Sequence, residues 1–256
     1  MLNFQKSSNP ILKQKSFDKD YTTSSEVMTV NGTMNKTAIM LFLVIAGAAF
    51  TWNKFFDAVF SDPAAGMAAV MPWMAIGGIG GLITALVTVF RPKSSGVTAP
   101  LYAFFEGLLL GAVSAILELK FGGIVMRAVL LTLSVFMAML FLYRSGIIKV
   151  TRKFAMGVFA ATAGIALVYL FSFIGGMFGM EMSFLHGNSN LSIGISLLIV
   201  AVAALNLVLD FAFIEQASAS GAPKYMEWYG AFGLMVTLIW LYMEILRLLA
   251  KFASRD

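Results

Sequence analysis

Long runs of apolar residues, separated by short polar links, make up most of the chain after a polar opening segment. Seven of these runs approach the ~20 residues that a helix needs to cross a bilayer: residues 37–56, 68–90, 100–119, 124–143, 154–178, 191–214 and 228–249. The pattern therefore predicts an all-α polytopic membrane protein, a seven-transmembrane-helix bundle over residues 37–252. We expect residues 1–36 to be a polar cytoplasmic tail rather than a signal peptide, and residues 253–256 to be a C-terminal tail.

The amino-acid composition also places the chain in a membrane, and it removes several kinds of chemistry. Apolar residues make up 59% of the 256 residues and charged residues 12%, whereas about 25% of a soluble domain is charged. The sequence has no cysteine, and its single histidine, His186, lies in a polar link. Thiolate chemistry, zinc sites and histidine-based catalysis therefore lack the residues they need, and we expect no enzyme and no cofactor other than a possible calcium ion. The lysines and arginines form no basic face, so no nucleic-acid partner is expected.

The distribution of basic residues predicts the orientation, because cytoplasmic segments of membrane proteins carry an excess of lysine and arginine. With the N-terminus inside, twelve of the 18 basic residues fall on the cytoplasmic side and six on the outer side. The sequence therefore predicts a cytoplasmic N-terminus and an outer C-terminus.

Glycines are concentrated inside the second apolar run, at residues 77, 78, 80 and 81. A phosphate-cradling loop is one interpretation, but the cluster follows no predicted strand and lies in the middle of a span. Small residues allow helices to approach closely in lipid, so we expect a packing role.

Acidic residues in the last two apolar runs and the link between them are the strongest functional signal in the sequence. They are Asp210, Glu215, Glu227 and Glu244, the last with Arg247 beside it. A charge in a transmembrane helix costs at least ~2.5–3.5 kcal/mol even on the lenient insertion scale. Acids that are kept in or near a span are therefore candidates for an ion or proton pathway.

Four short motifs lie along the chain: SNP at residues 8–10, MTVNGT at residues 28–33, EGLLLG at residues 106–111 and WLYMEILRLL at residues 240–249. Together they resemble the bacterial Bax inhibitor-1/YccA-like family of membrane proteins. The resemblance covers nearly the whole chain. It implies a seven-helix bundle with the last helix near the centre, in the bacterial inner membrane. It also implies a pH-sensitive calcium leak channel gated by two aspartates, one on the sixth helix and one on the seventh.

The first of these aspartates corresponds to Asp210, although Phe211 and Ala212 follow it where the family has Thr-Gln. The second has no clear counterpart, and both Glu227 and Glu244 are candidates. Glu244 should lie about 25 Å from Glu227 along the seventh helix. Asp210 and Glu227 should both lie near the cytoplasmic side, and we expect these two carboxylates to meet.

Two further polar residues could join this pair. Asn206 precedes Asp210 by four residues and shares its helix face, and Glu106 lies about two turns into the third helix. Two close carboxylates cannot both ionise cheaply, so they would share a proton that a cation or a pH change displaces. Their hard oxygen atoms suit calcium, which makes Asp210 and Glu227 the expected metal ligands.

Structural roles remain open for the same acids. Asp210 could be a hydrogen-bonded packing residue, and Glu227 could be a helix N-terminal acid stabilised by the helix dipole. For Glu244 and Arg247 a local i,i+3 salt bridge is the favoured interpretation.

The leading functional hypothesis is a passive calcium or other cation leak under proton control. A non-conducting regulator that binds another membrane protein, such as a membrane protease, is the second hypothesis. A proton-coupled transporter is the third, favoured by the intramembrane acids.

Overall fold

The computed structural model of the chain describes residues 27–179 and 187–255. Within these residues seven α-helices are long and apolar enough to cross a membrane. They are α2 (Val30–Ser61), α3 (Ala65–Phe90), α4 (Ser95–Lys120), α5 (Ile124–Arg144), α6 (Arg152–Met177), α8 (Asn190–Ala219) and α9 (Met226–Ala253), with a 3-10 turn η2 (Pro92–Ser94) before α4. The predicted all-α, seven-helix membrane bundle is confirmed.

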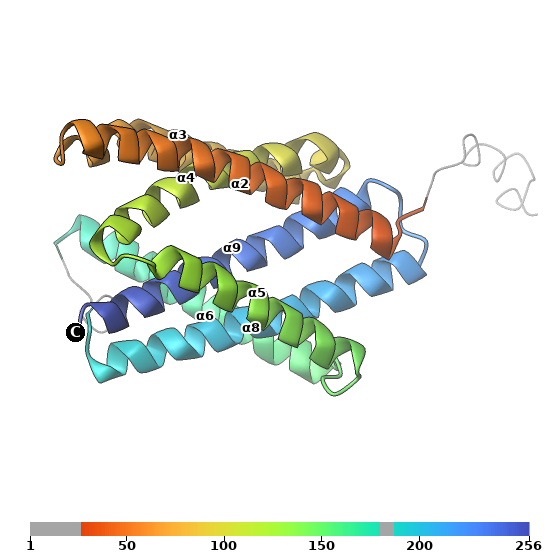
Figure 1. Ribbon diagram of the computed structural model, residues 1–256. Helices are drawn as coiled ribbons and strands as arrows, with labels where there is room; N and C mark the ends of the chain where they lie inside the picture. Colours follow the sequence, from red (N-terminus) through yellow and green to blue (C-terminus); the bar gives the residue numbers. More distant parts are fainter. Residues whose placement is uncertain (1–26, 180–186, 256) are drawn as a thin grey trace, which may run out of the picture.

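The helices form two groups with the last helix between them (Figure 1). Helices α2, α3 and α4 pack against one another on one side, and α5, α6 and α8 lie on the other. Helix α9 contacts α2, α4, α5 and α8, so it bridges the two groups near the centre of the bundle. Its apolar residues Leu234, Leu241 and Leu246 are fully buried in this position. The central last helix implied by the family resemblance is therefore present.

Several helices extend beyond their predicted apolar runs, and α2 and α8 do so in ways that bear on the candidate site. Helix α2 begins at Val30 rather than at residue 37, because the hydroxyl of Thr29 caps it by accepting a hydrogen bond from the Gly32 amide at 2.9 Å. Helix α8 continues to Ala219, so Glu215 lies on the helix and not in a polar link. Glutamate, glutamine and alanine are good helix formers, which allows the polar residues after Ile214 to extend the helix beyond the apolar run.

Glycines bring the helices of the first group into backbone contact. A Cβ atom added to Gly47 of α2 would lie 2.6 Å from the carbonyl oxygen of Phe104 in α4. A Cβ atom on Gly77 of α3 would lie 2.7 Å from the carbonyl oxygen of Phe105. Both distances are too short for a real side chain, so these glycines allow the close packing of α2 and α3 on α4. For Gly77 this confirms the expected packing role of the glycine cluster.

Candidate functional site

Asp210 lies on α8, where it faces the central helix α9. Its Oδ2 atom is buried and makes no hydrogen bond to any group in the described part of the chain. The side chain of Thr237 from α9 interacts with the Asp210 carboxyl group, and a Cβ atom on Gly233 would lie 3.8 Å from its Oδ1 atom. Thr237 follows Gly233 by four residues, so both lie on the face of α9 that meets Asp210. A buried polar atom without a partner typically costs about 1–3 kcal/mol, which marks this carboxylate as a candidate site.

The residue that faces Asp210 from α9 is therefore a hydroxyl-bearing residue and not a second acid. This differs from the pair of aspartates that the family resemblance implies. It also differs from the expected pairing of Asp210 with Glu227, because none of the hydrogen bonds or ion pairs that the structure gives to Glu227 involves Asp210. Among the described residues, no three His, Cys, Asp or Glu side chains gather where they could hold a metal ion.

Asn206 does not turn its amide nitrogen to Asp210. The Nδ2 atom donates to the Thr162 hydroxyl of α6 at 2.8 Å and to the Val202 carbonyl oxygen at 2.9 Å. Asn206 thus ties α8 to α6. The four-residue spacing predicts that Asn206 and Asp210 share a helix face. In the structure, however, Asn206 binds Thr162 of α6, whereas Asp210 meets Thr237 of α9.

Glu227 is a buried acid in the first turn of α9, and its carboxylate is held by residues at the start of α2. The Thr29 amide and the Thr29 hydroxyl each donate to its Oε1 atom at 2.9 Å. Lys36 forms an ion pair with the Oε2 atom, and the Lys224 ammonium lies 3.4 Å from Oε1. This carboxylate therefore lies at the N-termini of two helices, where the helix dipoles stabilise negative charge. With two lysines beside it, Glu227 is poorly placed as a calcium ligand.

The same contacts explain the MTVNGT motif. A Cβ atom on Gly32 would overlap the Glu227 carboxylate, so glycine is required at this position for the close approach of the two helices. The Met28 amide donates to the Ala222 carbonyl oxygen at 2.7 Å, and the Ser218 hydroxyl donates to the Met28 carbonyl oxygen at 3.2 Å. The segment before α2 is thus fastened to the connection between α8 and α9.

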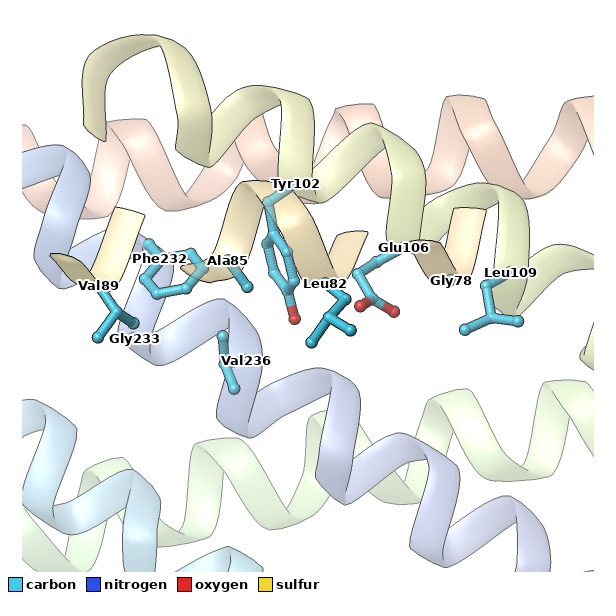
Figure 2. A pocket seen from close by; sticks show the side chains of 10 residues that line it. All are labelled: Gly78, Leu82, Ala85, Val89, Tyr102, Glu106, Leu109, Phe232, Gly233 and Val236. Carbon is cyan, nitrogen blue, oxygen red and sulfur yellow. The ribbon is translucent and has the colours of Figure 1, made fainter. Parts of the chain in front are cut away.

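Glu106 of α4 lines an open groove of 520 Å³ between α3, α4 and α9 (Figure 2). Its carboxylate and the Tyr102 hydroxyl, one turn earlier, point to the same side of α4. Gly81 leaves the room for this carboxylate, because a Cβ atom there would lie 2.8 Å from Glu106 Oε1. In the described part of the chain Glu106 has no hydrogen bond or ion pair. Gly233 lines the same groove, so the groove reaches the segment of α9 that also faces Asp210.

Glu244 and Arg247 form the i,i+3 ion pair expected from their spacing, with Nη1 at 3.0 Å from Oε1 and 3.2 Å from Oε2. Tyr169 of α6 joins the pair, since its hydroxyl donates to Glu244 at 2.8 Å and accepts a hydrogen bond from Arg247. Sequence reasoning missed the next member of this face, Lys251. Its ammonium is buried and donates to the hydroxyls of two α8 serines, Ser192 at 2.7 Å and Ser196 at 2.8 Å.

The spacing of Lys251 from Glu244 and Arg247 in the sequence predicts that its side chain is buried. It follows Arg247 by four residues and Glu244 by seven, so all three lie on one face of the helix. Because Glu244 faces the bundle, Lys251 has to face it as well.

The fold and these buried charges define a multi-pass, all-helical membrane protein with ionisable groups inside the bundle. A family model described as Bax inhibitor 1 like matches residues 9–254. The chain therefore belongs to the Bax inhibitor 1 like family, which confirms the resemblance seen in the sequence motifs. No curated protein and no solved structure matches the chain.

Proposed function

We propose that this protein is a passive pathway for cations, calcium in particular, across the bacterial inner membrane, and that protonation of Asp210 controls it. The observation that carries the proposal is the buried Asp210 Oδ2 atom, which has no hydrogen-bond partner among the described residues. A packing residue in a membrane helix would be fully hydrogen-bonded, because an unpaired polar atom in an apolar environment is costly. A carboxylate in this condition is stable when it holds a proton or when a cation and water reach it.

The groove at Glu106 supplies a route to this carboxylate. Glu106 lines it without a hydrogen-bond or ion-pair partner among the described residues, and Gly233 belongs both to the groove and to the surroundings of Asp210. A cation in this region would meet the oxygen atoms of two carboxylates and of the Thr237 hydroxyl. Calcium takes six to eight oxygen ligands, so this set binds it weakly and with several waters. Weak binding favours passage over storage, because a conducted ion has to leave as easily as it enters.

Proton control follows from the contact between α8 and α9. A protonated Asp210 is neutral and can donate a hydrogen bond across the helix interface to Thr237. Ionised Asp210 can only accept, so the Thr237 hydroxyl serves at most one of its oxygens, and Oδ2 needs water or a cation beside it, which favours separation of the two helices. We therefore expect flux to rise with pH.

The membrane orientation is part of the same proposal. With the N-terminus in the cytoplasm, the Glu227 cluster lies at the cytoplasmic end of α9. Asp210 precedes the cytoplasmic end of α8 by nine residues, or about 13 Å along the helix. The apolar run ends at residue 214, so the carboxylate lies about one turn inside the apolar segment, where ionisation is still costly.

Calcium flux into proteoliposomes loaded with a fluorescent calcium indicator tests the proposal. A leak moves calcium down its own gradient with no second gradient imposed. Flux only when a proton or substrate gradient is applied would instead indicate a coupled transporter. A calcium flux no larger than that into protein-free liposomes at every pH would contradict conduction. It would favour a regulator that binds another membrane protein.

A further inference from the structure

A second groove, separate from the one at Glu106, runs between α6 and α8. Its volume is 370 Å³, and apolar side chains line it, among them Ala161, Ile165 and Val168 of α6 and Ile195, Leu198 and Val202 of α8. Gly164 also lines it and leaves it open, because nothing lies within 4 Å of a Cβ atom built there. Helices α6 and α8 run in opposite directions (Figure 1), and the lining extends from Ala161 to Tyr169 on α6 and from Ile195 to Val202 on α8. The groove therefore follows the helix axes for roughly 10 Å.

One end of this groove is polar. Tyr169 lines the groove at the end marked by Val168 and Ile195, and its hydroxyl is bonded to Glu244 and Arg247. Arg247 uses its Nη1 atom for both of these partners, while Nε and Nη2 make no hydrogen bond within the described residues. The side chain is 35% exposed, and its guanidinium lies 5.2 Å from the centre of the Tyr169 ring. A guanidinium held on one side and open on the other can bind a phosphate through two parallel hydrogen bonds.

The charges at this end are predominantly positive. Lys251 lies one turn beyond Arg247 on α9, and Arg255 donates to the Asn190 side chain at 2.8 Å at the start of α8. Glu244 pairs with Arg247 at 3.0 Å. Arg247 lies six residues before the end of α9, or about 9 Å from it along the axis. Since the headgroup layer is roughly 5–8 Å thick, the guanidinium lies near its boundary with the hydrocarbon.

We propose that this groove binds one phospholipid with an anionic headgroup. The acyl chain lies between α6 and α8, from Tyr169 toward Ala161, and the phosphate binds the free side of the Arg247 guanidinium. The polar end lies at headgroup depth and the apolar part points to the middle of the bilayer, which is the arrangement of a phospholipid. The basic side chains of Arg247 and Arg255 at this end of the described chain favour an anionic headgroup over a zwitterionic one. The groove lies nearer the start of α8 than Asp210 does, and this inference does not depend on cation conduction.

The test is titration of the delipidated full-length protein with dioleoylphosphatidylglycerol, with bound lipid counted by native mass spectrometry. We expect one lipid to bind more tightly than the others, and more tightly than dioleoylphosphatidylcholine. Dioleoylglycerol, which has the same chains and no phosphate, should bind roughly tenfold or more weakly, as expected for the loss of a charge-assisted bidentate contact. Equal binding of all three lipids would overturn the proposal and indicate an apolar lipid contact without headgroup selection.

Two variants separate the parts of the site. Gly164→Leu fills the groove without altering a charge and should abolish the tight binding, whereas Gly157→Leu on the exposed surface of α6 should not. The double variant Glu244→Gln, Arg247→Gln keeps hydrogen-bonding groups for Tyr169 while removing both charges, and it should remove the preference for phosphatidylglycerol. Arg127→Gln, an exposed arginine at the same end of the bundle, is its control. Unchanged lipid preference in the double variant, or unchanged binding in Gly164→Leu, would place the lipid elsewhere.

Discussion

Glu227 and Lys36, which are 191 residues apart in the chain, form a buried ion pair that joins the start of α9 to α2. Thr29 adds two hydrogen bonds to the same carboxylate, and Lys224 adds a second positive charge. Glu227 thus fixes the central helix to the first helix and to the segment before it. We interpret it as a positioning residue that holds α9 in the register where Thr237 meets Asp210.

Removing the Glu227 charge should destabilise the protein. Breaking a fully buried ion pair costs about 3–5 kcal/mol. We expect about 2–3 kcal/mol for Glu227→Gln, because the Lys36 side chain remains 16% exposed and the Lys224 side chain 43% exposed. Thermal unfolding in detergent measures this effect. In a double-mutant cycle with Lys36→Met the two losses should be clearly non-additive, and strict additivity would show that the pair is not coupled.

Gly32→Ala should disturb the same contact by a different route. Its Cβ atom would overlap the Glu227 carboxylate, so either this carboxylate leaves Thr29 and Lys36 or the start of α2 moves away from α9, and both weaken the contact. Gly157→Ala in α6 is the matched control, since nothing lies within 4 Å of a Cβ atom at this position. The control should be neutral or slightly stabilising, because alanine favours a helix by about 1 kcal/mol over glycine. Similar melting temperatures for the two variants would contradict the tight approach at Gly32.

Charge reversal tests the pair at the other end of α9. Either Glu244→Arg or Arg247→Glu alone leaves two like charges beside Tyr169 and should reduce the yield of folded protein. The double reversal restores opposite charges at the same spacing and should recover part of that yield, measured by size-exclusion chromatography in detergent. If the double variant is no better than the single ones, Glu244 and Arg247 are not energetically coupled.

The orientation can be tested on this chain because it contains no cysteine. Single cysteines at Ser94 and Ser145 should react with a membrane-impermeant maleimide only after the membrane is opened. A cysteine at Gly122, in the turn between α4 and α5 at the opposite end of the bundle, should react in intact cells. Labelling of Ser94→Cys or Ser145→Cys from outside would reverse the predicted topology.

The sequence predicts the seven helices well because each span needs a long apolar run. It also predicts the Glu244–Arg247 pair, which depends only on spacing within one helix. The contacts of Glu227 could not be predicted in this way, since its main partners lie on a helix almost 200 residues earlier. The pairing of Asp210 failed for another reason. Charge and the four-residue spacing point to other acids and to Asn206 as its partners, while the side chain that faces it belongs to Thr237, whose hydroxyl carries no charge signal.

The pH dependence of calcium flux in proteoliposomes, compared between the wild type and Asp210→Asn, tests the proposed function most directly. Asparagine keeps the size of the side chain and cannot ionise, so we expect a flux that no longer changes with pH. Asp57→Asn, an exposed acid on α2, is the control and should behave as the wild type. Glu106→Gln should lower the rate of flux while leaving it pH-dependent, because Asp210 remains. If Asp210→Asn folds normally and keeps the pH response of the wild type, Asp210 is not the proton-sensitive group and the proposal is contradicted.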